Sequence, residues 1–393
     1  MAEARTRRQA ATRWGALAGL TLLAACQTGP RRRPVTPPPP PPREQTPPPA
    51  VTQGLPTDAE RHRVALLVPM TGSNAGVGTS IANAANMAVI DTGGQRIRVT
   101  MYDTAGGAGA AASRALAEGN KVILGPLTAD EVRQVAPVAR AADVPVVAFS
   151  NDTSVAGDGV YLLGYAPEQA VRRVVDYARG QGVTGFAGLV PTGVYGQRAS
   201  AGLTQSVREA DGRLTAVQVF DRRPGALLTA AARVGQAGPF EAVLIADTAS
   251  VAAQAAPVIR RNGGANARLL GTELWNTDSR LASYAPLRGA YFASVSDTLY
   301  RQLATKYRAR FGRAPYRLAS LGYDSVLLIT KIATVWPVGR PFPERELRDR
   351  DGFTGIDGAF RFGNSLIAER ALEVQQVGAS GPTVVSPAPR GFR

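Results

Sequence analysis

The stretch Arg63-Val-Ala-Leu-Leu-Val-Pro69 decides the fold class, because it is a short and continuous apolar run. A glycine-bearing segment, Thr71 to Gly78, follows it directly, and a helical pattern then continues to about Asp91. A continuous apolar run of this length is typical of a strand that is buried on both faces of a parallel sheet. The strand, turn and helix therefore predict the first unit of an α/β protein.

The same alternation of strand and helix continues through most of the chain. Further strands are predicted at 96–102, 121–125, 145–149, 161–163, 186–190, 214–220, 242–246 and 268–270. Helical patterns separate most of them, as expected for parallel strands that need crossover connections. One series ends near residue 163 and the other near residue 293. The sequence thus predicts an α/β fold with two lobes, each a parallel sheet flanked by helices.

Three segments, in this order and at these spacings, resemble the type I periplasmic binding-protein family. Val64-Ala-Leu-Leu-Val-Pro-Met-Thr-Gly72 is similar to the family's opening strand and ligand loop. Ile123-Leu-Gly-Pro-Leu-Thr128, with Val144-Pro-Val-Val-Ala-Phe-Ser150 after the next helix, is similar to its second signature. Phe353-Thr-Gly-Ile-Asp-Gly-Ala-Phe-Arg-Phe362 is similar to its returning strand. The resemblance covers roughly residues 61–378.

The resemblance implies two Rossmann-like lobes, hinged by three crossovers of the chain. Residues 61–165 and 294–340 are then expected to form lobe one, with helices near 297–311 and 316–335 returning to it. Residues 166–293 and 341–378 are expected to form lobe two. The last residues, 379–393, are expected to be a flexible tail.

The N-terminus predicts a secretory signal. Basic residues precede an apolar stretch from about Trp14 to Ala25, which is too short to span a bilayer. Leu23-Ala-Ala-Cys26 resembles a bacterial lipobox and contains the only Cys of the chain. The resemblance implies that residues 1–25 are removed and Cys26 is acylated; the alternative is an ordinary signal peptide. By the same resemblance, Gln27 after the Cys favours the outer membrane of a Gram-negative cell, on its periplasmic side.

Residues 26–60 are expected to be an acylated Cys followed by a disordered tether. Residues 27–60 hold 12 of the 29 prolines, including the unbroken run Pro37 to Pro42. Such a segment favours extended polyproline II and, at about 3 Å per residue, would reach on the order of 100 Å. It would serve as a passive spacer or reach a partner away from the anchoring membrane.

Composition excludes several functions. One Cys and one His leave no internal disulfide and no Cys- or His-rich metal site, so we expect no cofactor or metal. The net charge of +15 comes almost entirely from scattered Arg, which favours a solvated surface over a nucleic-acid site. No Gly-x-Ser-x-Gly and no Ser-x-x-Lys motif occurs. The protein is therefore predicted to bind rather than to catalyse.

Ligands of open α/β sheets lie beyond the carboxyl ends of the strands. The candidate cleft residues are Thr71, Ser73, Thr128, Ser150 and Thr153 in lobe one, and Tyr195, Asp247, Glu273 and Trp275 in lobe two. Hydroxyls and helix N-termini would receive a carboxylate, and either lobe-two acid would pair with an ammonium group. Four of these positions match those that bind amino acids in relatives: Thr128, Ser150, Tyr195 and Glu273.

Several of these candidates also have a purely structural interpretation. Ser73 and Thr128 are ordinary helix N-caps, and Glu131 completes a capping box with Thr128. The segment 150–153 is equally a polar turn, and Trp275 would either stack on a ligand or fill the lobe.

Two functions fit a lipoprotein of this fold. One is activation of a penicillin-binding peptidoglycan synthase. The segment from Pro145 to Pro167 and the helix with Arg172-Arg173 resemble the corresponding part of the penicillin-binding-protein activator lipoproteins. The outer-membrane anchor and long tether favour this reading, because a synthase lies in the inner membrane. The alternative is the substrate-binding lipoprotein of an ABC importer, which would present an amino acid of the leucine or branched-chain type, or an amide, to its permease.

Overall fold

The computed structural model describes residues 60–389, 391 and 392. These belong to one compact unit, Gly54–Arg393. The expected signal peptide, the acylated Cys26 and nearly all of the tether lie outside the described residues. Within this unit the α/β fold class is confirmed: two sheets with parallel cores are each flanked by helices.

Lobe one is built on a five-stranded parallel sheet in the order β2-β1-β3-β4-β5. Side chains of β1 alternate between two cores, with Val64, Leu66 and Val68 on one face and Ala65 and Leu67 on the other. Because both faces are covered, the strand reads as continuously apolar. Its strands are β1 (His62–Val68), β2 (Ile97–Asp103), β3 (Ile123–Leu124), β4 (Val146–Ala148) and β5 (Val160–Leu162).

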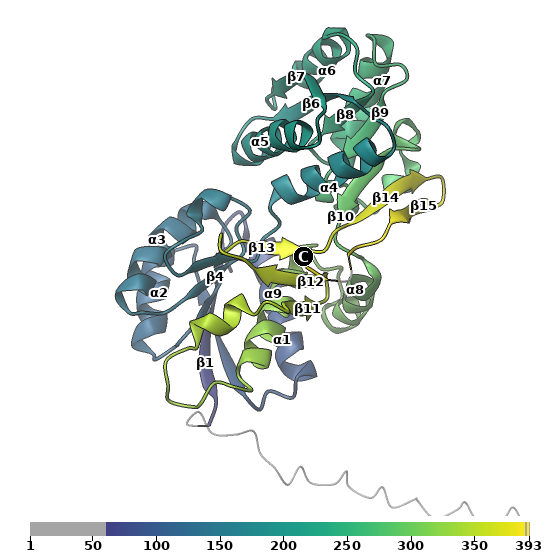
Figure 1. Ribbon diagram of the computed structural model, residues 1–393. Coiled ribbons are helices and arrows are strands. Elements are labelled where there is room, and N and C mark those ends of the chain that lie inside the picture. Colours follow the sequence, from purple (N-terminus) through teal and green to yellow (C-terminus); the bar gives the residue numbers. More distant parts are fainter. Residues whose placement is uncertain (1–59, 390, 393) are drawn as a thin grey trace, which may run out of the picture. The chain divides into compact units, whose positions relative to one another are not determined.

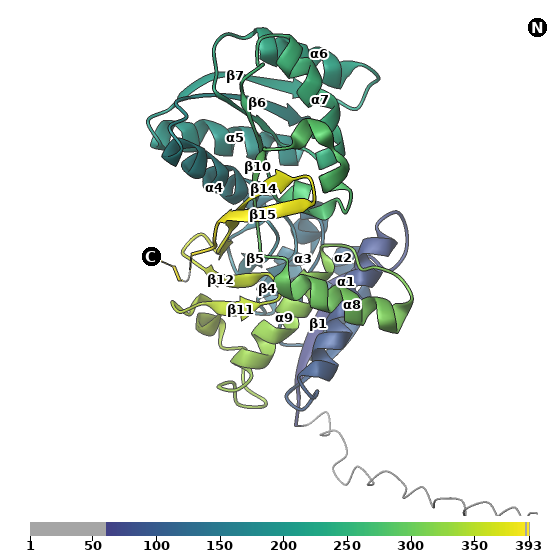
Figure 2. The same cartoon turned by 90° about the vertical axis from the view of Figure 1, so that its right-hand side faces the viewer.

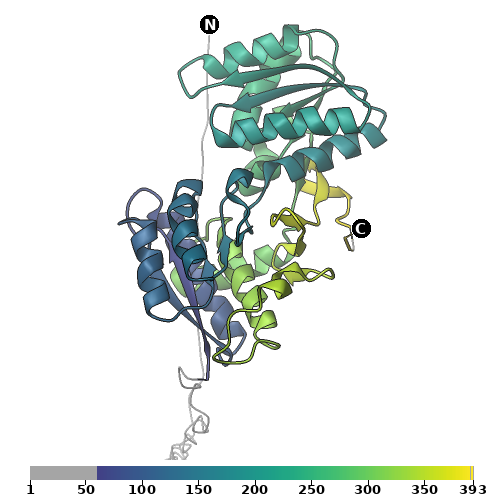
Figure 3. The ribbon, with the colours of Figure 1, turned by 60° about the vertical axis from the view of Figure 1, so that its left-hand side comes forward.

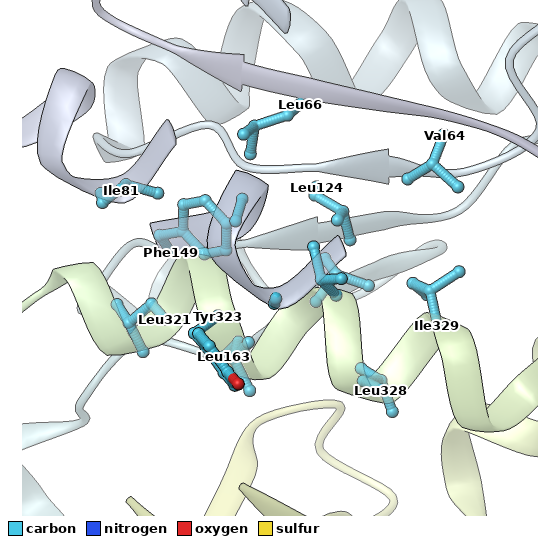
Figure 4. Packing of buried hydrophobic residues seen from close by; sticks show 14 of the residues in the cluster. Val64, Leu66, Ile81, Leu124, Phe149, Leu163, Leu321, Tyr323, Leu328 and Ile329 are labelled. Atoms are coloured by element: carbon cyan, nitrogen blue, oxygen red, sulfur yellow. The ribbon is translucent and has the colours of Figure 1, made fainter. Parts of the chain in front are cut away.

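Helices cover both faces of this sheet. Helices α2 (Ala108–Ala117) and α3 (Ala129–Ala141) pack on one face. On the other face lie α1 (Ala75–Asp91) and α9 (Ala319–Ile332), with α8 (Thr298–Phe311) beside them. Figure 4 shows how Ile81 of α1 and Leu321 of α9 meet the sheet residues Leu66 and Leu124 in this core.

Lobe two is built on a seven-stranded mixed sheet in the order β15-β14-β10-β9-β8-β6-β7. The parallel part holds β6 (Gly185–Pro191), β7 (Arg213–Phe220), β8 (Ala242–Ile245), β9 (Arg268–Gly271) and β10 (Tyr291–Ser294). One face is covered by α4 (Pro167–Gly180) and α5 (Val194–Glu209). The other is covered by α6 (Ala226–Gln236) and α7 (Ala249–Arg261).

The C-terminal part of the chain differs from the prediction that residues 341–378 join lobe two. A small antiparallel sheet of β11 (Phe353–Gly355), β12 (Gly358–Phe362) and β13 (Ala368–Arg370) packs on the core of lobe one instead. The reason is apolar burial, because Phe353, Phe360 and Phe362 all enter that core. The chain enters the second sheet only at β14 (Glu373–Gly378).

The expectation of a flexible tail from residue 379 is also corrected. Strand β15 (Gly381–Ser386) pairs antiparallel with β14, beside β10 (Figure 2). Gly378 and Gly381 close the hairpin, and Gly381 has a φ of 130°, which a side-chain-bearing residue rarely adopts. Arg173 of α4 holds the end of this strand by donating to Ser386 Oγ at 2.7 Å.

In the described residues the chain passes between the lobes after β5, after β10 and after β13 (Figure 3). Side chains join these crossovers. The Gln169 amide donates to the Ala368 carbonyl at 2.8 Å and accepts from the Arg370 amide at 3.0 Å. Gln375 Nε2 donates to Ser294 Oγ at 3.3 Å. Hydrogen bonds therefore connect all three crossover segments to one another.

Candidate functional site

A pocket of about 1000 Å³ is lined by residues of both lobes. The strand ends place these residues, because the loops after β1, β3, β4 and β9 all open toward it. Much of the lining is apolar. Lobe one contributes Asn74, Val77, Leu127, Thr128, Phe149, Asn151, Asp152, Tyr316 and Arg317, lobe two contributes Val194, Glu273, Leu274 and Asn276, and the crossovers contribute Tyr165, Ser294 and Val295.

Thr128 lines the pocket, but its polar groups are already used. Its side chain accepts from the Glu131 amide at 3.3 Å, while its own amide and hydroxyl donate to Glu131 Oε2 at 2.8 and 2.9 Å. Thr104 also donates to this carboxylate. The N-terminus of α3 thus carries a carboxylate of the chain itself, which satisfies the exposed amides and the helix dipole.

Asp152 also lines the pocket and is fully paired. Arg198 Nη2 lies 2.8 Å from its Oδ1 and Arg133 Nη2 lies 3.1 Å from its Oδ2. Burial opposes ionisation, but hydrogen bonds from Ser154 and Arg198 outweigh it and lower the pKa of Asp152 to about 2. Because Arg198 stands on α5 and Asp152 follows β4, this ion pair joins the two lobes.

The remaining lobe-one candidates do not line the pocket. Ser150 Oγ accepts from the Asp152 amide at 3.1 Å and therefore shapes the turn. Thr153 donates to Glu168 Oε1 at 3.2 Å. Thr71 donates to Asp103 Oδ2 at 2.8 Å, and both Thr71 and Ser73 are exposed. Of the five lobe-one candidates, the structure places only Thr128 on the pocket wall.

Glu273 differs from every other acid on the pocket wall. It follows β9, and Tyr195 donates to its Oε1 at 3.0 Å. Its Oε2 is buried and has no hydrogen-bond partner. Burial raises the pKa of Glu273 to about 7, with a smaller contribution from the charge of Glu168. Tyr195 stays a hydroxyl donor, since burial and the neighbouring Glu273 raise its pKa.

Of the lobe-two candidates only Glu273 lines the pocket, and Tyr195, Asp247 and Trp275 do not. Asp247 Oδ2 is 2.7 Å from Arg222 Nη2, and Asp247 Oδ1 accepts from the Thr248 amide at 2.7 Å. Trp275 is fully buried and packs near Phe292 in the core of lobe two. Trp275 therefore fills the lobe, which is one of its two predicted roles.

A buried ionic cluster behind the pocket was not found from the sequence. Arg317 Nη2 lies 2.8 Å from Asp357 Oδ1, and its Nη1 donates to Tyr165 Oη at 3.2 Å. Arg317 also stacks over the Tyr300 ring at 4.1 Å. Burial acts against the charge of Asp357, but Arg317 and Arg370 lower its pKa. Asp357 and Tyr165 lie 40 and 152 residues from Arg317, so no local motif signals these contacts.

No helix in the described part of the chain has the length and apolar content needed to cross a bilayer. Within the same residues, no group of three or more His, Cys, Asp or Glu is arranged to hold a metal ion.

The fold and the pocket define a two-lobed α/β protein with a ligand-sized cavity between its lobes. Residues 62–364 match the model of the family described as periplasmic binding protein, and the chain belongs to that family. This family implies a periplasmic or otherwise extracytoplasmic location. The recognition made from the opening strand, the second signature and the returning strand is confirmed.

Solved structures show the same fold. A putative branched-chain amino acid ABC transporter protein from Rhodospirillum rubrum has a TM-score of 0.71 and 17% identity, covering 83% of this chain and 100% of that one. The leucine-binding protein LivK from Thermotoga maritima has a TM-score of 0.61 and 19% identity over 84% of this chain and 99% of that one. An ABC transporter substrate-binding protein from Sphaerobacter thermophilus has a TM-score of 0.68 and 18% identity over 85% and 98%.

A curated relative is also found. An uncharacterized protein of Rickettsia prowazekii, RP748, is 28% identical over 166 residues. The match spans 42% of this chain and 44% of that protein, so it covers less than half of either.

Proposed function

We propose that the protein is the non-catalytic substrate-binding component of an ABC importer and captures a small amino-acid-like or amide ligand between its lobes. The observation that carries this proposal is Glu273, an unpaired carboxylate on the wall of a pocket of about 1000 Å³. A buried carboxylate without a cationic partner is costly, and an ammonium or amide group of a ligand would supply the missing donor.

The rest of the pocket suits the body of such a ligand. Val77, Leu127 and Phe149 line it from lobe one, and Val194 and Leu274 line it from lobe two. Burying an aliphatic side chain of leucine size in such surroundings contributes about 2 kcal/mol. Structural neighbours support the same class, since one of them, LivJ from Streptococcus pneumoniae, was solved with isoleucine.

The proposal includes anchoring through Cys26 to the periplasmic face of a membrane, favoured as the outer membrane by Gln27. The permease is then the partner to which the ligand is delivered. Radiolabelled palmitate should enter the wild-type chain in cells but not the Cys26→Ala variant, and fractionation of the labelled protein should place it in the outer membrane.

Thermal unfolding of the purified protein against a panel of amino acids and amides tests the binding function. A ligand at 100 times its Kd adds about 2.7 kcal/mol to the folded state by mass action, which appears as a rise in Tm. We expect at least one such rise for the wild type and its loss in Glu273→Gln. The exposed Glu209→Gln on α5 changes the charge equally and should keep the rise. A flat response across the panel would contradict the importer function.

A second function, activation of a penicillin-binding synthase, is favoured by one observation. The Thr128 donors that would receive a ligand carboxylate are occupied by Glu131, and Ser150 does not line the pocket, as expected if the cleft no longer binds amino acids. This function predicts that the protein retains a bifunctional synthase in a pull-down and speeds its glycan polymerisation or cross-linking. Unchanged synthase rates with saturating protein would argue against it.

A further inference from the structure

The two sides of the pocket offer a ligand very different partners. On the lobe-one side, the Thr128 hydroxyl and amide donate to Glu131, and Ser150 is buried away from the pocket wall, where its Oγ accepts from the Asp152 amide. A ligand carboxylate placed against α3 would lie beside the Glu131 carboxylate rather than beside open donors. This side therefore repels a second negative charge.

The cations near the pocket are also matched by acids of the chain. Arg317 is the charged donor on the wall, and it is paired with Asp357 at 2.8 Å and lies 3.5 Å from Asp297. Arg133 and Arg198 both bind Asp152. The charge of each of these guanidinium groups is thus matched by a carboxylate of the chain, and a ligand carboxylate would meet no unmatched cation among them.

One charge on the wall has no counterpart. Glu273 accepts hydrogen bonds only from neutral donors, its own backbone amide and the Tyr195 hydroxyl, and its Oε2 has no partner. The nearest further acid that influences it is Glu168, whose charge is also negative. A ligand with one positive charge would match the charge of Glu273, whereas the carboxylate of a zwitterion would be buried without an unmatched cation beside it, which is unfavourable.

We infer that the ligand of this pocket is a monocation: a primary amine, or the amide of an amino acid, with an aliphatic or aromatic body and no free carboxylate. The ammonium group is placed at Glu273 and the body against Leu127, Phe149 and Val194. The inference rests on the proposed function, since it takes the pocket to be the ligand site, and it narrows the class of ligand.

Four compounds with the same branched body separate the charges: L-leucine, L-leucinamide, 3-methylbutylamine and 3-methylbutanoate. Calorimetric titration of the purified full chain at pH 8 would give their Kd values. We expect leucinamide and the amine to bind at least tenfold more tightly than leucine, and the carboxylate not to bind. A wider series of linear, branched and aromatic amines and amino-acid amides, each paired with its parent acid or amino acid, extends the comparison to other bodies.

Glu273→Gln should weaken leucinamide and amine binding at least tenfold, while Glu209→Gln leaves both unchanged. The Gln variant keeps the size of the side chain, and its unfolding curve shows that it is folded. Equal binding of the cations by Glu273→Gln and the wild type overturns the inference.

The outcomes separate the two proposals. Leucine, or any amino acid of the series, binding as tightly as its amide or more tightly overturns the monocation inference and leaves the importer function standing. An absence of binding across the whole series and the amino-acid panel overturns both.

Discussion

Two carboxylates of the same pocket, Asp152 and Glu273, are treated in opposite ways. Asp152 is held by two Arg residues and its pKa falls to about 2. Glu273 has only neutral donors, and burial raises its pKa to about 7. The charge of Asp152 is therefore matched by cations of both lobes, whereas the charge of Glu273 has no cationic partner. Ion pairs within the chain stabilise the fold, whereas a buried carboxylate without a cationic partner indicates a ligand-binding site.

The largest loss of stability is expected when the buried ion pair between Arg317 and Asp357 is broken. Arg317→Met removes the cation that faces Asp357 and Asp297 and breaks the buried ion pair, with Arg370 as the remaining cation that acts on Asp357. We expect a loss of about 3–5 kcal/mol in the free energy of unfolding at pH 7, measured by urea denaturation. The exposed Arg313→Met in the preceding loop should change it by less than about 0.5 kcal/mol. Equal effects of the two variants would contradict the role given to the cluster.

Removing the charge of Glu273 should raise the free energy of unfolding, which is the opposite of the Arg317→Met effect. The folded pKa of Glu273 is about 7 against an ordinary 4.5, so the folded protein keeps this proton to higher pH than the unfolded chain. Stability therefore falls as pH rises from about 4.5 to 7, and the full penalty is present above pH 7. Glu273→Gln should gain about 3 kcal/mol at pH 8 and almost nothing at pH 4.

Urea denaturation of wild type and Glu273→Gln at both pH values measures this gain. The neighbours that face Glu273 are Tyr195 and Glu168. Glu168→Gln removes a negative charge that raises the pKa of Glu273, so this companion variant should lower that pKa. A gain that is the same at pH 4 and pH 8 would show that the carboxylate is not the source of the cost.

Asp152→Asn should be less severe than the Arg317 change, because its Arg partners are partly exposed and solvent screens them. We expect a loss of about 1–2 kcal/mol at pH 7. Since the pKa of Asp152 is lowered from 3.8 to about 2, this stability is present above pH 4 and is lost as pH falls through 2. Asp158→Asn is the control: Asp158 forms an exposed ion pair with Arg140, so the substitution should have little effect on the urea midpoint.

The smallest effect is expected for the cap of α3. Thr128→Ala removes one side of the capping box and should cost about 1 kcal/mol, seen as a lower urea midpoint with an unchanged m-value. The exposed Thr204→Ala within α5 removes a hydroxyl without removing a cap and should not destabilise.

The fold was predictable because its signals are local. The run at 63–69 became β1 (His62–Val68), since a strand covered on both faces must be apolar throughout. The spacing of Thr128 and Glu131 likewise anticipated the capping box that the structure contains. Both depend on residues close together in the chain.

The parts that sequence reasoning missed depend on distant pairings. Arg317, Asp357 and Tyr165 meet across separations of 40 to 192 residues, and neither periodicity nor spacing reports such a meeting. Trp275 shows the other difficulty: it follows a strand end, as cleft residues do, yet its ring enters the core. Position after a strand predicts which loop a residue lies on but not the direction of its side chain.

Strand β15 has a consequence for how the protein behaves among its neighbours. It ends the seven-stranded sheet, so its outer edge is where another chain would add a strand. Pro382 lies within this strand and offers no N–H to such an addition, and Arg173 binds the Ser386 and Pro387 carbonyls at the strand's end. These features are expected to disfavour the addition of a strand from another molecule at β15. Removal of residues 381–393 would leave β14 as the edge strand, and we expect the shortened chain to associate through it.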